Sequence, residues 1–340
     1  MQIELPISKS ITNRWLMLQA IHGDELMPVS DSMPDDVQIL HRALCLIALS
    51  PHRLIDVGNC GTAMRFLTAY CTQLEGQTTI LDGVERMRHR PIGQLVDALR
   101  EIGADIEYLG EEGFPPLRIK GCILDKHRIV TINNPLSTQF VSALLLIGAK
   151  VQTDSTSPYI YITQEVIKQY QLSPFSYHLS VEKDWSSAAF WYEYVALYGG
   201  EITLLGLSRD SLQGDKIVAD IFAHLGIHTT YTAEGAVISS SPLHPTPYTL
   251  HHDFVACPDL YPAVALTCER LGIELHATGV ESLPLKESDR LRAVREHRTD
   301  ADHRMAMALL IAGYEVDDTA CISKSYPNFI EHFRHINSLK

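Results

Sequence analysis

The chain has 340 residues and a mass of 38.0 kDa, so we expect one large or two medium domains. Hydrophobic residues make up 46% of it, which is enough for a sizeable core, but the longest apolar run covers only 140–149 and is too short for a membrane span. Acids outnumber Lys plus Arg by 41 to 28, and this net charge of −13 argues against partners such as nucleic acid or an anionic membrane.

The predicted elements alternate between short strands and helices, a pattern typical of an α/β protein built from many small units. The first ten residues carry Glu4 and no apolar core, so they do not form a secretory signal. A strand-like run at 201–207 gives way to a polar turn, and the best domain boundary lies near 205–212. Strands are predicted at 54–58, 79–83 and 128–132, and helices at 11–18, 63–70, 140–147 and 217–225.

Short polar residues stand where helices are expected to begin: Ser10, Thr62, Ser137 with Thr138, Ser186 with Ser187, and Asp302. Each is a good N-cap, and capping alone can explain any one of them. A helix N-terminus also attracts anions, and cations cluster in the same loops, namely Lys9, Arg14, Arg65, Arg86, Arg88 and Arg90. In an acidic protein this suggests an enclosed site for a small, multiply charged anion, although the run ERMRHRP alone could be a solvated basic loop.

Other common catalytic patterns are missing from the sequence. It contains no HExxH, no Walker A motif and no GxSxG. The sixteen histidines have no metal-like spacing, and the seven cysteines are scattered without a CxxC. We therefore expect reduced thiols and a cytoplasmic protein rather than a zinc site or a disulfide framework.

Ten motifs occur in one order between residues 5 and 333: PISKSITNR, NCGTAMRFLTA, ERMRHRPIGQLVDALREIGADIEY, GFPPLRI, STQFVSALL, VEKDWSSAAF, LQGD, LPLKESDRL, DHRMAMAL and SKSYPNF. Together they resemble the family of 5-enolpyruvylshikimate-3-phosphate (EPSP) synthase. The resemblance implies a two-domain inside-out α/β barrel of six βαβαββ units, three per domain. One domain would hold 10–208 and the other 1–9 with 209–340.

The resemblance also implies an activity of the shikimate pathway, which leads to the aromatic amino acids. Phosphoenolpyruvate and shikimate 3-phosphate would lie in the cleft between the domains, and the enolpyruvyl group would pass to the 5-hydroxyl of the latter. The enzyme would need no metal and no organic cofactor, would bind neither nucleic acid nor membrane, and would be a monomer.

Residue roles follow from the same motifs. Shikimate 3-phosphate would be bound by Lys9, Ser10, Arg14, Ser137, Thr138, Gln139, Ser187, Asp259 and Lys286. Phosphoenolpyruvate would be bound by Lys9, Gly61, Arg90, Gln139, Arg290, Arg304 and Lys324. The catalytic residues would be Lys9, Asp259 and Glu287.

The chemistry suits these residue types. The 5-hydroxyl adds to C2 of phosphoenolpyruvate while C3 is protonated, and the tetrahedral intermediate then loses phosphate. Asp259 would take the hydroxyl proton, and Glu287 would donate and later remove the proton at C3. Two phosphates and two carboxylates require several Arg and Lys. Taken singly, Asp259 could be a helix cap, Glu287 with Arg290 a helix pair, and Lys324 a surface lysine.

The chain departs from the family pattern at single positions. Cys60 stands where a smaller residue is usual, and Phe66 stands where Pro often follows AMR. Thr138 replaces Ser, and Ser282 occupies a position where many members have Asn.

A larger departure is one of length. Only eleven residues separate Arg290 from Asp302, where the family usually has several dozen, and a smaller deficit precedes VEKDW. Eleven residues cannot supply the missing strands and helix. Either the chain is pared down here or a segment is missing from this sequence, and we expect the second, so that the full chain would weigh several kilodaltons more than 38.0 kDa. A chain that is truly continuous here would instead expose strand edges.

Two other readings stay open at this point. The related UDP-N-acetylglucosamine enolpyruvyl transferase shares fold and chemistry, but it would lack the KSxxNR and Ser-Ser-Gln-like motifs. A catalytically inactive, phosphate-binding relative would explain the short spacing, but both candidate acids and all clamp cations are retained.

Overall fold

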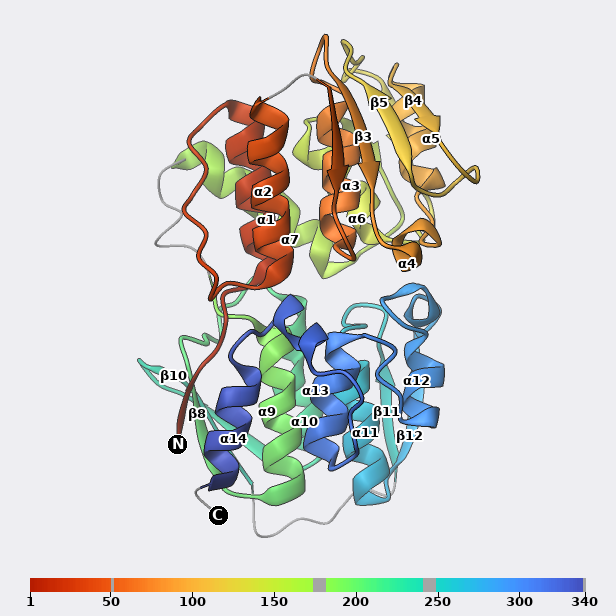
Figure 1. The fold of residues 1–340 in the computed structure, drawn as a ribbon. Helices are drawn as coiled ribbons and strands as arrows, with labels where there is room; N and C mark the ends of the chain where they lie inside the picture. The colour runs from red at the N-terminus through yellow and green to blue at the C-terminus, as the bar shows by residue number, and fades with distance from the viewer. Residues whose placement is uncertain (50–51, 174–181, 241–248, 339–340) are drawn as a thin grey trace. The chain divides into compact units, whose positions relative to one another are not determined.

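The computed structural model describes residues 1–49, 52–173, 182–240 and 249–338 (Figure 1). The chain forms two compact units. Unit 1 consists of Met1–Ser8, Ser32–Asp35 and Glu182–Lys340, and unit 2 consists of Lys9–Asp31 and Asp36–Val181. The sequence predicts a boundary after residue 208, whereas the contacts divide the chain after Val181.

Unit 2 contains one complete βαβαββ repeat. Its strands are β2 (His52–Asp56), β3 (Thr78–Asp82), β4 (Asp105–Tyr108) and β5 (Leu117–Lys120). They form a sheet in the order β2-β3-β5-β4, with β2 parallel to β3 and the other two pairs antiparallel. The helices between the strands are α3 (Gly61–Cys71), the short α4 (Glu85–Arg88) and α5 (Gly93–Glu101). Every second residue of β3, Thr79 and Leu81, is buried, so one face of the sheet faces the core.

Unit 1 repeats this topology with strands from distant parts of the chain. Its sheet has the order β1-β8-β10-β9, formed by β1 (Gln2–Glu4), β8 (Glu201–Leu205), β10 (Gly235–Ser240) and β9 (Ile227–Tyr231). Here too the first pair is parallel and the others are antiparallel. The helical segments between them are α9 (Trp185–Tyr198), η1 (Gly214–Ile217) and α10 (Val218–His224). The pairing of β1 with β8 explains why α9 and β8 belong to unit 1.

Each unit also contains a shortened repeat that ends after its second helix. In unit 2 it runs β6 (Ile129–Thr131), α6 (Thr138–Leu146), β7 (Lys150–Gln152) and α7 (Pro158–Leu172). In unit 1 it runs β11 (Thr249–Asp253), α11 (Tyr261–Leu271), β12 (Glu274–Thr278) and α12 (Arg290–Glu296). Both sheets have two parallel strands among the described residues. The resemblance implies six full units, and the described residues form two.

The shortened repeat of unit 1 leaves a strand edge exposed among the described residues. Within the described part of the chain, β12 pairs with β11 alone, and none of its five residues is buried. By contrast, β8 has two strand neighbours and buries Ile202 and Leu204. Among the described residues β12 thus has an exposed edge, as expected if the chain is continuous at this point.

The remaining elements are helices. Unit 2 adds α1 (Lys9–His22) and most of α2 (Asp35–Leu49), and α1 packs against α7. Unit 1 adds η2 (Leu283–Leu285), α13 (His303–Ala312), η3 (Ala320–Lys324) and α14 (Phe329–Ser338). No helix among the described residues is both long and apolar enough to cross a membrane.

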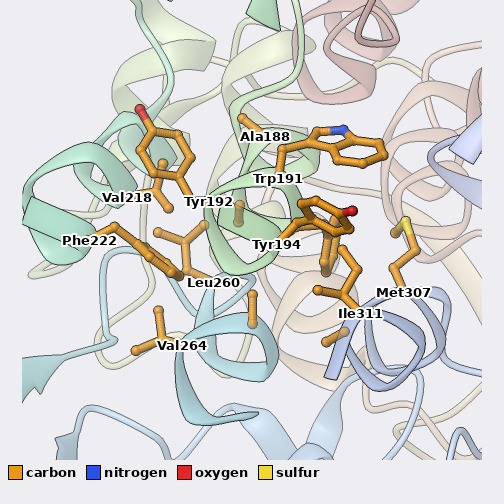
Figure 2. Close-up of a cluster of buried hydrophobic side chains, with 14 of the residues drawn as sticks. Ala188, Trp191, Tyr192, Tyr194, Val218, Phe222, Leu260, Val264, Met307 and Ile311 are labelled. Carbon is orange, nitrogen blue, oxygen red and sulfur yellow. The ribbon is translucent and has the colours of Figure 1, made fainter. Parts of the chain in front are cut away.

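The core of unit 1 is built around α9. From Trp185 to Val195 every residue of this helix is buried, because α10, α11 and α13 all pack against it. Figure 2 shows Tyr192 beside Val218 and Phe222, and the Tyr192 and Phe222 ring centroids are 5.6 Å apart. Tilted aromatic pairs of this kind stabilise a core beyond the area that they bury.

Several helix starts differ from the prediction. Ser137 and Asp302 are N-caps as expected, through hydrogen bonds to the N–H groups of Gln139 and Arg304. The other three predictions are wrong by one to three residues. α1 already includes Ser10, while the caps of α3 and α9 are Cys60 and Asp184. Thr62, Ser186 and Ser187 thus lie in first turns, where their N–H groups still point out of the helix end.

Candidate active site

Three helix N-termini are fixed next to one another in unit 2. The Nε2 of Gln139, in the first turn of α6, donates to Thr62 Oγ1 in the first turn of α3, at 2.8 Å. Arg14 of α1 donates through Nη2 to Ser142 Oγ of α6, at 3.2 Å. The first bond joins the starts of α3 and α6, and the second links α1 to the middle of α6; the N–H groups at helix N-termini favour an anion.

Residues expected to bind shikimate 3-phosphate lie at these helix starts. Ser10 lies in the first turn of α1, and its carbonyl accepts a hydrogen bond from Arg14 Nη1 at 2.7 Å. Ser137, Thr138 and Gln139 are half-buried at the start of α6. The structure therefore brings together Ser10, Arg14, Ser137, Thr138 and Gln139 within unit 2.

Gly61 lies between two guanidinium groups. A Cβ atom added to it would lie 2.6 Å from Nη1 of Arg65 and 2.6 Å from Nη1 of Arg90. Both arginines are buried, and Arg65 also donates to the Gly61 carbonyl at 3.0 Å. Gly61 and Arg90 were expected together in the phosphoenolpyruvate pocket, and the structure places them in contact. Arg65 is an additional cation there.

Lys9 forms an ion pair that the sequence analysis did not single out. Its Nζ lies 2.9 Å from Oδ2 of Asp36, a carboxylate that is almost fully buried in unit 2. The two successive acids at the start of α2 were the available sequence signal for this ion pair. Acids are common at helix starts, however, because they stabilise the helix end without any further role.

In unit 1, the two candidate catalytic carboxylates share one guanidinium. Arg290 Nη1 donates to Asp259 Oδ1 at 2.7 Å, and Nη2 donates to Glu287 Oε2 at 3.2 Å. Arg290 is itself only 1% exposed. Because the guanidinium is rigid and planar, it holds the two carboxylates at a set spacing.

The other expected cations of unit 1 surround the same pair of acids. Lys286 Nζ and Arg304 Nη2 lie 3.5 and 2.8 Å from the two oxygens of Asp259. Lys324 Nζ lies 3.0 Å from Glu287 Oε1. The structure thus brings Asp259, Lys286, Glu287, Arg290, Arg304 and Lys324 into one network, referred to below as the acid–cation network.

Two further carboxylates belong to this network. Asp302, fully buried, accepts from Arg290 Nε at 2.8 Å and from the Arg304 N–H at 2.9 Å. Asp215 of η1 accepts from Ser186 Oγ, and burial, followed by the nearby Asp259 charge, raises the pKa of Asp215 to about 7. Both belong to motifs of the resemblance, DHRMAMAL and LQGD, but motif membership alone did not reveal these contacts.

Ser187 lies in the first turn of α9, and its N–H donates to Asp184 Oδ1 at 2.7 Å. Its hydroxyl is fully buried and makes no hydrogen bond with the described residues. A buried hydroxyl of this kind retains its capacity for one donor and one acceptor contact.

The two groups differ in their charges. At the unit 2 helix starts, neutral hydroxyls and N–H groups accompany Lys9, Arg14, Arg65 and Arg90, an arrangement suited to anionic groups. In unit 1, carboxylates and cations are interleaved, an arrangement suited to proton transfer beside a bound anion. Among the described residues, no group of three or more His, Cys, Asp or Glu side chains could hold a metal ion.

The sequence matches the family described as EPSP synthase (3-phosphoshikimate 1-carboxyvinyltransferase) over residues 25–173, 147–297 and 295–333. It is 36% and 37% identical to the 3-phosphoshikimate 1-carboxyvinyltransferases of two strains of Bacteroides fragilis, each over 98% of this chain and 94% of the relative. A relative of the same name from Cellvibrio japonicus is 30% identical over 99% of this chain and 96% of its own length.

The alignment with the first of these relatives spans 393 positions, which exceeds the 340 residues of this chain by 53. Successive matched ranges of the family model overlap at 147–173 and at 295–297. These are the places where the sequence analysis found short spacing and where the two shortened repeats end.

A solved EPSP synthase structure from Acinetobacter baumannii has a similar fold, with a TM-score of 0.70 over 98% of this chain and 95% of that chain, at 20% identity. A second EPSP synthase structure from the same organism gives a TM-score of 0.65 with the same coverage. The two-domain α/β fold is therefore confirmed. With the family match over most of the sequence and relatives above 30% identity along nearly its whole length, this chain belongs to the EPSP synthase family.

Proposed function

We propose that this chain transfers the enolpyruvyl group of phosphoenolpyruvate to the 5-hydroxyl of shikimate 3-phosphate, with release of phosphate. Membership of the EPSP synthase family supports the reaction. The observation that supports this reaction at named residues is that Asp259 and Glu287 both accept hydrogen bonds from the guanidinium of Arg290.

The acid–cation network supplies the proton transfers. An ionised Asp259 can accept the proton of the attacking 5-hydroxyl, and Glu287 can give a proton to C3 and remove one again when phosphate leaves. Lys324, bonded to Glu287, and Arg304, bonded to Asp259, are the cations that would hold phosphoenolpyruvate next to these acids, together with Lys286 and Arg290.

The helix starts of unit 2 supply the binding of anions. Ser10, Arg14 and the start of α6 would hold the 3-phosphate and the shikimate ring, and Ser187 in unit 1 would add a hydroxyl contact. Gly61 with Arg65 and Arg90 would receive an anionic group of phosphoenolpyruvate. Lys9, held by Asp36, would contact both substrates and carry charge or a proton between them.

An assay of phosphate release tests this function. Phosphate should appear with shikimate 3-phosphate plus phosphoenolpyruvate, and not when UDP-N-acetylglucosamine replaces the former. Asp259→Asn should lower kcat by about 100-fold or more, as expected for loss of a general base, with substrate binding largely kept. Asp105→Asn, a change at an exposed ion pair with Lys120, is the matched control and should leave kcat unchanged. Turnover with UDP-N-acetylglucosamine alone would contradict the proposal, and no turnover with either acceptor would favour an inactive relative.

We further propose that the enzyme acts as a monomer in the cytoplasm. All seven cysteines are free thiols, as expected in a reducing compartment. The net charge of −13 opposes self-association. Light scattering should give a single species of 38.0 kDa.

A further inference from the structure

The loop between β8 and η1 is fastened to the start of α9 by one buried glutamine. Gln213 belongs to the LQGD motif and is only 4% exposed. Its Oε1 accepts a hydrogen bond from the Trp185 N–H at 3.1 Å, and its Nε2 donates to the Lys183 carbonyl at 2.8 Å. These partners lie 28 and 30 positions earlier in the chain, so the Gln213 amide joins two separate segments of unit 1.

The carboxylate of Glu182 orients that amide. Its Oε2 accepts from Gln213 Nε2 at 2.9 Å and from the Ser211 hydroxyl, and its Oε1 accepts from the Leu212 N–H at 2.8 Å. The reverse orientation of the amide would point its oxygen at the carboxylate, so the Gln213 side chain has a single favourable orientation. Three consecutive residues thus donate to one carboxylate. Glu182, Ser211, Leu212 and Gln213 are referred to below as the loop brace.

The loop brace fixes the first turn of α9 from outside the helix. The N–H groups of a first helical turn have no partner within the helix. Gln213 accepts from the Trp185 N–H, and the cap Asp184 accepts from the Ser187 N–H at 2.7 Å. Ser187 follows in this turn, and its buried hydroxyl makes no hydrogen bond with the described residues. The place of that hydroxyl is therefore set by its own cap and by a distant loop.

The far end of the same loop reaches the acid–cation network. Asp215, two residues after Gln213, is 3% exposed and accepts from Ser186 Oγ. Its other oxygen, Oδ1, is buried and makes no hydrogen bond with the described residues. Burial, and then the nearby Asp259 charge, raises the pKa of Asp215. A displacement of the loop would therefore move a buried carboxyl group away from Ser186 and change its distance to Asp259.

We propose that Gln213 and Glu182 are positioning residues, which hold Asp215 and the Ser187 turn of α9 in one arrangement before substrate binds. The proposal rests on the proposed function, in which Ser187 contacts shikimate 3-phosphate and Asp259 accepts its hydroxyl proton. The hydrogen bonds of the loop brace go to the backbone and to each other, so both residues act through the groups that they hold. Order of this kind strengthens binding because it is complete before the ligand arrives.

Steady-state kinetics of two variants test the positioning role. Gln213→Met keeps the length of the side chain but removes its three hydrogen bonds, and Glu182→Gln puts an NH2 group where donors point. Each should raise the KM for shikimate 3-phosphate about three- to ten-fold, as for one lost hydrogen bond, and leave the KM for phosphoenolpyruvate unchanged. The double variant should be no worse than the more impaired single variant, because both changes break the same brace.

Gln19→Met is the matched control. Gln19 is a glutamine of unit 2 that is 7% exposed, and its Oε1 likewise accepts from a backbone N–H, that of Met27, at 3.1 Å. Its replacement should leave both KM values unchanged. Hydrogen exchange reads the brace without any substrate: a peptide covering 209–216 should exchange faster in Glu182→Gln than in the wild type, while a peptide covering 227–231 should not. Ser211→Ala should act like Glu182→Gln, and Ser211→Thr, which keeps the hydroxyl, should restore the wild-type values.

The outcomes separate this inference from the proposed function. If the wild type does not turn over shikimate 3-phosphate, the proposed function fails, and hydrogen exchange alone decides whether the brace holds the loop. If the wild type is active and both single variants keep its KM for shikimate 3-phosphate, the positioning role is wrong and the function stands. A lower kcat with both KM values unchanged would also overturn the inference, because the residues would then only stabilise the fold. Should Gln213→Met not fold, the Ser211→Ala and Ser211→Thr pair decides.

Discussion

Glu193 is a carboxyl group buried in the core of unit 1 without a hydrogen-bond partner among the described residues. It lies on α9 between Tyr192 and Tyr194, and both of its oxygens are buried and unbonded. Burial raises the pKa of Glu193 well above its usual range. An unfolded chain ionises the same group near pH 4.3, so folding must keep it protonated, and the resulting loss of stability grows as the pH rises above about 4.3.

We therefore expect Glu193→Gln to be more stable than the wild type at neutral and alkaline pH. The gain should grow by roughly 1.4 kcal/mol per pH unit above about pH 4.3, until the folded pKa is passed. Urea unfolding at pH 5, 6.5 and 8 measures it. Glu101→Gln, at an exposed position on α5, is the control and should show no such trend. A Glu193→Gln curve that runs parallel to the wild type at all three pH values would refute the assignment.

The candidate site residues were predicted from contiguous motifs. The structure links several of them within their own unit, as in the contact of Gly61 with Arg90 and of Arg290 with Asp259 and Glu287, whereas the Ser187 hydroxyl makes no hydrogen bond with the described residues. Asp36 and Asp215 were not assigned roles, and Asp302 was assigned only that of a helix cap, because their contacts at the site come from partners elsewhere in the chain: Lys9, Ser186 and Arg290. The sequence shows which residues are carboxylates, but the residue that each carboxylate pairs with depends on how the chain packs.

At the scale of elements, the connection from α12 to α13 is tight. His297, Asp300 and Ala301 all have positive φ angles, of 50°, 46° and 56°, within five residues. The left-handed region costs a residue with a side chain roughly 1–2 kcal/mol, and Ala has no polar group to offset this cost. The six residues between the helices thus replace a strand pair at a cost in backbone strain.

Ala301→Gly should relieve part of that strain. After the greater entropy of glycine in the unfolded state is subtracted, we expect a gain of about 0.5–1 kcal/mol in the free energy of unfolding. Thermal melts followed by circular dichroism would show it. Ala20→Gly, in the last turns of α1, should instead lose about 1 kcal/mol. If both variants lose stability alike, the connection is not strained.

The exposed strand edges predict uneven protection from hydrogen exchange. Backbone amides of β12, which has one strand neighbour among the described residues and no buried residue of its own, should exchange faster than those of β8, which has two such neighbours. Exchange followed by mass spectrometry on peptides covering 274–278 and 201–205 compares them. Equal protection of the two peptides would show that something else covers the β12 edge.

Local patterns predicted some of these elements. The strands at 54–58, 79–83 and 128–132 correspond to β2, β3 and β6, because short runs rich in Ile, Val, Leu and Thr stand there between polar or glycine-containing turns. Helix starts were less accurate. The Cys60 thiol is a weak acceptor that is not expected to cap a helix, yet it caps α3. The sequence spacing indicated a short connection between α12 and α13, and the six residues between these helices leave no room for a further strand pair.

At the scale of the whole molecule, the division into two units could not be located by the same means. Ile3 pairs with Leu204 across the sheet of unit 1, and neither the hydropathy pattern nor the polar turn at 208–215 carries a signal of that pairing. Sequence patterns report on neighbours within a few residues, whereas this sheet joins strands that lie some two hundred residues apart. The repeated strand order of the two units became visible only in the structure.

The same pairing bears on the order in which the protein is made. The ribosome releases β1 first, but its partner β8 follows only after the whole of unit 2 has been synthesised. At about 5–20 residues per second, some 10–40 seconds pass between the two. During that time the residues of unit 2 can fold together, while β1 (Gln2–Glu4) has no strand to pair with. A strand of three residues with charged Glu4 at its end is short and polar enough to remain unpaired during this time without pairing with a wrong strand edge.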